Sequence, residues 1–366
     1  MTAGADARER ILVLNPGSTS TKLAVFEGGA SVLEETLRHG REELAEFPTI
    51  MDQLEYRKGM VLGLLAERGI EVESLAAVVG RGGLMRPVAS GTYAVNNAML
   101  DDVRVGYLGQ HASNLGAVLA HEIAGPAGLP SFVVDPVVVD EMNELARYSG
   151  VPEIERKSLV HALNVKATAR RAARELGRPL DGINLVVAHL GGGISVVAMD
   201  RGRMTDVSSA LSAGPFTPER AGTVPTLELV DMCFSGDFAQ GEVRRKLVGG
   251  GGFVAYLGTN SAKEVEDRIV AGDERAAVVM DAMLYQVAKE IGAMAAVLKG
   301  NVDGVVMTGG LANAEYITSR LASYIDFIAP VIVVPGEDEM EALAEGCLRV
   351  LRGEEPALEY PGETEA

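Results

Sequence analysis

Apolar residues along this chain form short runs that alternate with stripes at helical spacing, a pattern that predicts an α/β protein with mixed sheets. The short runs predict buried strands at residues 11–14, 23–26, 76–79, 131–134, 302–307 and 331–334. The stripes predict helices at residues 44–68, 97–104, 113–124, 162–176, 276–299 and 339–351. Residues 208–225 are rich in Gly, Pro, Ser and Thr and predict a long irregular segment, which is often functional.

Two segments repeat one pattern far apart in the chain. Residues 11–26 read ILVLNPGSTSTKLAVF and residues 185–199 read LVVAHLGGGISVVAM. Each predicts a β-hairpin whose turn carries no bulky side chain, so that backbone N–H groups can approach an oxyanion closely. The repeat predicts a duplicated nucleotide-binding core, in which two like-folded domains face across a cleft and a phosphate is held between the loops.

Composition narrows the class of protein. A length of 366 residues favours two domains, and the net charge of -18 counts against a nucleic-acid partner. The N-terminus lacks an apolar signal core, and no apolar run is long enough to span a membrane. Cys233 and Cys347 match no metal-ligand spacing. We therefore expect a cytoplasmic protein with reduced thiols and no membrane or nucleic-acid partner.

The loop at residues 15–22, NPGSTSTK, is the strongest local signal for chemistry. An ordinary surface turn needs only about two to four such residues, whereas this loop continues through a run of hydroxyl side chains and closes on a lone lysine. Hydroxyls and one cation beside a glycine suit a phosphate and its metal. The candidate ligands are Asn15, Gly17, Ser18, Ser20 and Lys22. The loop does not match the Walker or the dinucleotide-binding motif.

Glycines gather in two further loops. A glycine triplet inside the second hairpin costs backbone entropy and indicates either a bulge or a close-lying ligand. Residues 308–313 predict a strand-to-helix turn, where a helix N-terminus attracts phosphate and bare glycines also admit an adenine face. The candidate nucleotide-binding residues in these loops are His189, Gly191, Gly192, Gly193, Gly309 and Gly310.

Four other side chains are candidates, each with a structural alternative. Arg81 lies among glycines at a strand end, where ligands bind in α/β sheets, and would also suit a solvent-facing turn. Asp135 ends a buried strand as either a turn cap or a magnesium-associated carboxylate. His161 begins a helix, where a single histidine is more often structural than catalytic. Arg220 suits either a phosphate clamp or a surface pair with Glu219.

Taken in order along nearly the whole chain, these segments resemble the acetate and butyrate kinase family, part of the sugar kinase, actin and seventy-kilodalton chaperone superfold. Acetate kinases carry a loop, N-x-G-S-S-S-x-K, that is similar to residues 15–22. The resemblance looks closer to the butyrate branch, because residues 159–164 read LVHALN where acetate kinases have F-H-G-T-S-H. Residues 214–220, GPFTPER, and 335–340, PGEDEM, also look like that branch.

This resemblance implies a fold and a reaction. The fold would be two duplicated ribonuclease H-like domains: residues 1–160, with residues 340–366 packing back on them, and a nucleotide-binding domain at residues 161–339. The reaction would be reversible, direct in-line phosphoryl transfer from ATP to a short-chain carboxylate, butyrate or a branched relative. Its products would be ADP and an acyl phosphate. The resemblance also implies Mg²⁺ and a homo-oligomer.

The same resemblance implies roles for single residues. By position, the family's phosphate and metal region corresponds to Asn15, Ser18, Ser20 and Lys22, and its catalytic residues correspond to Arg81, Asp135 and His161. Its second phosphate loop corresponds to His189 and the glycine triplet, and its adenosine turn corresponds to Gly309 and Gly310. The family's T-R-x-G-D arginine is missing, because residues 223–226 read TVPT, and Arg220 is the candidate substitute. The metal-linked glutamate corresponds to Asp338 or Glu339, of which Glu339 is favoured.

Two other functions fit the same superfold. A nucleotide-dependent regulator would bind ATP without forming acyl phosphate. A kinase acting on a hydroxyl substrate, such as a sugar, would need a carboxylate base beside that hydroxyl, and Asp135 could serve. A carboxylate acceptor needs no base, because it is already ionised at neutral pH.

Overall fold

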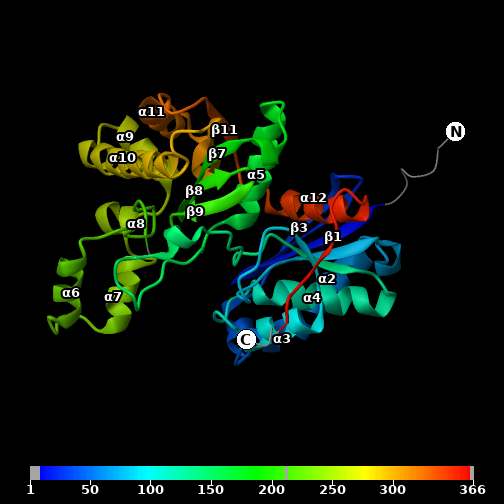
Figure 1. Cartoon of the computed structure of the whole chain (residues 1–366). Coiled ribbons are helices and arrows are strands. Elements are labelled where there is room, and N and C mark those ends of the chain that lie inside the picture. Colours follow the sequence, from blue (N-terminus) through cyan, green and yellow to red (C-terminus); the bar gives the residue numbers. More distant parts are fainter. Residues whose placement is uncertain (1–8, 210, 212, 363–366) are drawn as a thin grey trace. The chain divides into compact units, whose positions relative to one another are not determined.

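The computed structural model describes residues 9–209, 211 and 213–362, which divide into two compact units (Figure 1). The first unit consists of the described residues up to Val139 together with those from Asp338 onward. The second unit is Asp140–Glu337. Each unit has its own sheet and its own hydrophobic core, so each is described by itself.

The units divide after residues 139 and 337, whereas the sequence interpretation placed the divisions after residues 160 and 339. The intervening segment belongs with the second unit because of its hydrogen bonds. Lys166 Nζ donates to Glu141 Oε2 over 2.6 Å, and the backbone N–H of Asn143 donates to the carbonyl oxygen of Thr205 over 2.9 Å. These long-range contacts leave no mark in composition, so the sequence could not reveal them.

The sheet of the first unit has the strand order β12-β5-β6-β4-β1-β2-β3 among the described residues. Its strands are β1 (Arg10–Pro16), β2 (Ser20–Glu27), β3 (Ala30–Arg38), β4 (Ala77–Arg81), β5 (Thr92–Ala94), β6 (Ser131–Val134) and β12 (Leu358–Glu359). β1, β2 and β3 form an antiparallel meander, while β1, β4 and β6 run parallel. The predicted hairpin is therefore present, with Asn15 opposite Lys22.

In the described part of the chain, the sheet of the second unit has five strands in the order β11-β10-β7-β8-β9, which corresponds to the β6-β4-β1-β2-β3 part of the first sheet. Its strands are β7 (Asn184–Leu190), β8 (Ile194–Asp200), β9 (Arg203–Val207), β10 (Gly304–Gly309) and β11 (Val331–Pro335). β7, β8 and β9 form the antiparallel meander, while β7, β10 and β11 run parallel. The five strands of this sheet thus share one topology with five of the seven strands of the first sheet, which confirms the predicted duplication.

Helices cover both faces of the first sheet. They are α1 (Arg41–Ala45), α2 (Leu54–Glu67), α3 (Asn97–Val105), α4 (Asn114–Ala124) and α12 (Glu339–Leu351). The side chains of Leu12 and Leu14 join α2 and α4 in one core, and α12 packs on β1, β4 and β6. Figure 1 shows α12 and the α2–α4 pair on opposite sides of the strands. Alternate side chains of β1 are therefore buried on each face, which explains the unbroken apolar run at residues 11–14.

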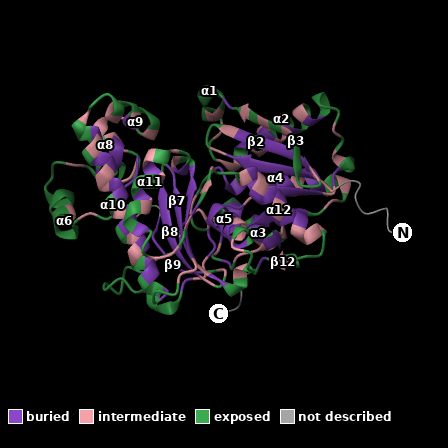
Figure 2. Ribbon diagram, turned by 90° about the horizontal axis from the view of Figure 1, so that it is seen from above, coloured by how far each residue is buried: buried purple, intermediate pink, exposed green. Residues whose placement is uncertain are grey.

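The second unit places α5 against β7, β10 and β11, and α10 against β7, β8 and β9. Its helices are α5 (Ala162–Glu175), α6 (Thr226–Phe234), α7 (Gln240–Leu247), α8 (Gly252–Leu257), α9 (Ala262–Val270), α10 (Glu274–Val297) and α11 (Glu315–Ile325). β7, β8 and β10 are buried almost throughout, while α6 buries none of its residues and is green in Figure 2. In the part of the chain described, no helix has the length and apolarity that a membrane crossing requires.

Two local predictions were incomplete, and a third is confirmed. The helix expected at residues 44–68 is two helices, because the chain turns after Ala45 and resumes in α2. β3 was missed because it is an edge strand with mostly polar, exposed residues. The irregular segment at residues 208–225 is confirmed for its described residues, while positions 210 and 212 lie outside them.

Bare backbone lets α4 lie directly on β4. A Cβ atom on Gly80 would stand 2.0 Å from the carbonyl oxygen of Gly116, and one on Gly116 would stand 2.1 Å from the carbonyl oxygen of Arg81. Neither position can accept a side chain without moving the helix from the strand. This contact sets the depth at which the end of β4, and hence Arg81, is held.

Gly80→Ala should therefore destabilise the protein by about 1–3 kcal/mol, because the added methyl group overpacks the contact between α4 and β4. Gly59→Ala is the matched control: it lies within α2, a Cβ there meets nothing within 4 Å, and the change should stabilise by about 0.5–1 kcal/mol. Differential scanning calorimetry checks both. A Gly80→Ala protein with the same melting temperature as wild type would contradict the close contact between α4 and β4.

Candidate functional site

Three predicted site residues meet at one end of the first sheet. Asn15 lies near the end of β1, Arg81 ends β4, and Glu339 begins α12. Asn15 Nδ2 donates to Glu339 Oε2 over 2.7 Å, and Arg81 Nη1 donates to the same oxygen over 2.5 Å. The Arg81 side chain is still 30% exposed and that of Glu339 16% exposed, so a ligand can reach both. The structure thus brings together an amide, a carboxylate and a guanidinium from three distant segments.

This cluster can be tested against the chemistry of a magnesium ion. Mg²⁺ takes hard oxygen ligands and is usually held by one or two carboxylates together with substrate phosphates and water. The described residues contain no group of three or more His, Cys, Asp and Glu side chains arranged to hold a metal. Glu339 and the amide oxygen of Asn15 therefore fit an ion that a phosphate substrate would help to bind.

The first loop connects β1 to β2 beside this cluster. Ser18 and Lys22 are exposed, Ser20 is half-buried, and the N–H of Gly17 donates to the carbonyl oxygen of Ser20 over 2.7 Å. Lys22 lies opposite Asn15 in the β1–β2 pairing, so both side-chain positions belong to the same end of the hairpin. Phosphate binding by these residues stays a prediction.

Asp135 follows β6 in a left-handed backbone conformation, with φ at 38°. Few residues other than glycine adopt this region, and such strain concentrates at functional sites. Asp135 is buried, and its Oδ1 accepts hydrogen bonds from Ser90 Oγ over 2.5 Å and from the N–H of Gly91 over 2.8 Å. The carboxylate is therefore held by the turn at residues 90–91, and its role in magnesium binding stays a prediction.

His111 was missed by the sequence interpretation and lies close to Arg81. Its Nδ1 lies 2.9 Å from Ser113 Oγ, at the start of α4. Burial and then the Arg81 guanidinium lower the pKa of this imidazole below its ordinary value. No motif marks His111, because its neighbours in sequence are unremarkable.

The second unit brings two predicted histidines into contact. The rings of His161, before α5, and His189, on β7, stack with centroids 4.1 Å apart and planes 25° apart. His161 Nδ1 lies 3.1 Å from Ser195 Oγ on β8, opposite His189 in the strand pairing. His189 is buried, its Nε2 lies 3.3 Å from Glu337 Oε1, and its Nδ1 has no hydrogen-bond partner.

Glu337 is the acidic partner in this group. The hydrogen bond from His189 is the main cause that lowers its pKa to about 2, and burial acts in the opposite direction. The sequence interpretation considered residues 336–339 as a carboxylate source but favoured Glu339. The chain in fact divides there: Glu337 belongs to the second unit and Glu339 to the first.

The glycine loop after His189 lies against charged side chains, and this explains its composition. A Cβ atom on Gly193 would stand 2.3 Å from Arg220 Nη1, and one on Gly191 would stand 2.8 Å from Glu337 Oε1. Thr217 Oγ1 donates to the carbonyl oxygen of Gly192 over 2.6 Å. The predicted residues Arg220 and the glycine triplet are therefore neighbours.

The second glycine turn belongs to the same end of this sheet. Gly309 has φ at 92°, and a Cβ atom there would stand 2.3 Å from the carbonyl oxygen of Leu190. Gly309 and Gly336 also exchange backbone hydrogen bonds of 3.1 and 3.2 Å. A Cβ atom on Gly310 would meet nothing within 4 Å, so the space beside it is open, while its carbonyl oxygen accepts from Asn313 Nδ2 over 3.0 Å.

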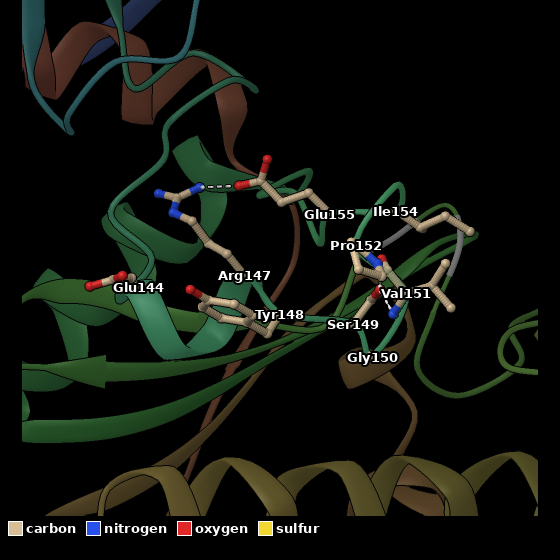
Figure 3. Close-up of a pocket in the computed structure, with 9 residues that line it drawn as sticks. All are labelled: Glu144, Arg147, Tyr148, Ser149, Gly150, Val151, Pro152, Ile154 and Glu155. Atoms are coloured by element: carbon tan, nitrogen blue, oxygen red, sulfur yellow. Dashed lines mark hydrogen bonds and ion pairs between the residues drawn. The ribbon is translucent and has the colours of Figure 1, made fainter.

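A hollow of about 570 Å³ lies elsewhere in the second unit, on the segment at residues 144–155 (Figure 3). Arg147, which lines this hollow, makes a bidentate ion pair with Asp140, with N–O distances of 2.7 and 2.8 Å. Figure 3 shows Tyr148, Val151 and Ile154 projecting from this segment. The hollow contains none of the residues predicted from the sequence.

Comparisons with known proteins bear on the fold and on part of the chain. Residues 153–331, a little under half of the chain, match the Acetokinase family model. The structure is similar to an acetate kinase from Porphyromonas gingivalis (22% identity, TM-score 0.76, covering 94% of this chain and 100% of that chain). It is also similar to a propionate kinase from Francisella tularensis subsp. tularensis (20% identity, TM-score 0.70, covering 92% of this chain and 98% of that chain). A third similar structure is an acetate kinase from Entamoeba histolytica (17% identity, TM-score 0.71, covering 92% of this chain and 98% of that chain). At these identities the likeness shows the fold, as the resemblance predicted.

Glu337→Gln should change how stability depends on pH. The folded-state pKa of Glu337 lies below the ordinary 4.5, so its stabilising contribution is fully present above pH 4.5 and is lost as the pH falls towards 2. The difference in melting temperature between wild type and variant should shrink from about pH 6 to about pH 3. Scanning calorimetry measures it, with exposed Glu153→Gln as the control. A difference that is constant with pH would contradict the His189–Glu337 pair.

Proposed function

We propose that this protein is an ATP-dependent carboxylate kinase that converts a short-chain carboxylate, butyrate or a branched relative, into its acyl phosphate. The observation that carries the proposal lies at the strand ends of the first sheet, where Asn15 and Arg81 both donate hydrogen bonds to one carboxylate oxygen of Glu339. The duplicated fold and the Acetokinase match over residues 153–331 support it.

The first unit supplies the groups for the transferring phosphoryl group. Arg81 uses Nη1 for Glu339, and its guanidinium carries further N–H donors that can bind phosphoryl oxygens. Phosphoryl transfer mainly requires positioning and charge stabilisation. A carboxylate oxygen attacks the γ-phosphorus as the bond to the ADP oxygen breaks, and no proton has to be removed from the acceptor.

The second unit supplies groups for the nucleotide phosphates. The open space beside Gly310 and the glycine loop after His189 allow close approach of phosphate oxygens. His189 is oriented by Glu337, and His161 by Ser195. Arg220, which lies against Gly193, is the candidate for the missing second arginine of the family.

Magnesium would be held by Glu339 and Asn15 together with phosphate oxygens, and when bound it would offset the charge on the phosphates. Before it binds, Arg81 and Asn15 neutralise and orient the Glu339 carboxylate. The homo-oligomeric state and the cytoplasmic location stay predictions.

Wild-type protein given magnesium-ATP and a panel of short acids should form acyl phosphate, which hydroxylamine traps as the hydroxamate. Butyrate, isobutyrate, isovalerate and propionate differ by a methylene or a branch, so we expect rates that differ by about 10–200-fold. ATP binding without hydroxamate from any acid would favour a nucleotide-dependent regulator. Phosphorylation of a sugar or glycerol instead would favour a hydroxyl kinase using Asp135.

Arg81→Ala should lower turnover by about a thousandfold while changing the dissociation constant for ATP less than about threefold, because the guanidinium acts on charge in the transition state. Hydroxamate kinetics and calorimetric ATP titration separate the two quantities. Arg104→Ala removes a half-exposed arginine of α3 and serves as the control. Near-normal turnover in Arg81→Ala would refute the assignment.

A further inference from the structure

Arg57 of α2 is a charged side chain that is fully buried in the first unit. Among the described residues, no carboxylate lies in contact with it. Its guanidinium instead donates to Gln53 Oε1 over 3.1 and 2.8 Å, to Thr21 Oγ1 over 3.1 Å, and to backbone carbonyl oxygens of the first loop. Burying a guanidinium without an opposite charge is costly, so its retention calls for a reason.

The carbonyl oxygens of the first loop are all engaged on the protein side. Arg57 Nη1 donates to the carbonyl oxygens of Gly17 and Ser20 over 2.9 and 3.0 Å, and Nη2 approaches that of Ser18 at 3.4 Å. The remaining carbonyl oxygen, that of Thr19, accepts from the backbone N–H of His39 over 2.9 Å. Four consecutive groups that would repel an anion are thus turned inward.

His39 completes this buried layer without adding a second charge. Its Nε2 lies 2.9 Å from Thr21 Oγ1, and the side chain is buried. Burial, and then the nearby Arg57 guanidinium, lower the pKa of His39 to about 4, so its imidazole is neutral at neutral pH. Burial also lowers the pKa of Arg57, but an arginine stays protonated in proteins. One uncompensated positive charge therefore lies behind the loop.

We propose that Arg57 is a positioning residue that shapes residues 17–20 into an anion site and places a positive charge behind it. The inference rests on the proposed function, which assigns this loop to the transferring phosphoryl group. Arg57 acts through the loop: it withdraws the carbonyl dipoles, and its charge attracts the phosphate across a single layer of backbone. The phosphate is the opposite charge that Arg57 lacks within the protein.

Two substitutions separate the geometric and electrostatic parts. Arg57→Lys keeps the charge but loses the planar fork that reaches several carbonyl oxygens at once, whereas Arg57→Gln loses both. Arg68→Gln is the matched control, because Arg68 is an exposed arginine at the end of the same helix, paired with Glu35. Gln53→Ala keeps the Arg57 charge and removes the acceptor that orients its Nε and Nη2 atoms.

Hydrogen exchange over residues 17–21, calorimetric binding of inorganic phosphate and hydroxamate kinetics are the readouts. In Arg57→Gln we expect the hydrogen-exchange rate of residues 17–21 and the dissociation constant for phosphate each to rise about tenfold. The kcat should fall about a hundredfold, while the KM for the acid should change less than about threefold. Arg57→Lys should lose about tenfold in kcat, and Arg68→Gln should stay within about twofold of wild type.

The outcomes are distinguishable from failure of the proposed function. If wild type forms no hydroxamate, the carboxylate kinase proposal fails, while exchange and phosphate binding still decide the role of Arg57. A folded Arg57→Gln protein with wild-type exchange, phosphate affinity and kcat would overturn the inference. If that variant does not fold, Gln53→Ala decides: faster exchange with lower kcat supports the role, and wild-type values overturn it.

Discussion

The carboxylate of Glu339 is the interaction on which the geometry of the first unit depends. One oxygen accepts hydrogen bonds from Asn15 at the end of β1 and from Arg81 at the end of β4. It thereby ties two neighbouring strands to the start of α12, which itself packs across the sheet. Because a bidentate-capable arginine and an amide share one carboxylate, moving any of the three would displace the other two. The proposed chemistry needs this constraint, since phosphoryl transfer depends on position more than on reactive groups.

Elements with a strong apolar period could be predicted from the sequence, and elements without one could not. The hairpins at residues 11–26 and 185–199 were visible because buried strands and bare loops both leave a mark in composition. β3 is an exposed edge strand and α6 buries no residue, so neither follows a core-facing pattern. The division of the chain after residue 139 depends on contacts such as Lys166 with Glu141, which join distant positions.

The residues of the candidate site likewise fall into those that the sequence indicates and those that it does not. The loop glycines and Arg81 could be proposed from the sequence because a bare backbone beside a cation is conspicuous there. His111 was missed, and Glu337 was considered but Glu339 was favoured, because only the folded chain shows that they lie near Arg81 and His189. Arg57 was hidden for a related reason: within a helix, an arginine is usually solvated, and nothing in its neighbours indicates complete burial. Residues that act on a loop from behind cannot be recognised from the loop's own motif.

The discontinuous composition of the first unit has a consequence for synthesis on the ribosome. β1 and β4 emerge early, but the helix that carries Glu339 is made only after the whole of the second unit. The second unit is one continuous stretch and can reach its final form while the nascent chain is still growing. The first sheet must meanwhile wait with one face uncovered. Translation therefore makes α12 the closing step for a unit whose first strand, β1, is synthesised before the whole of the second unit.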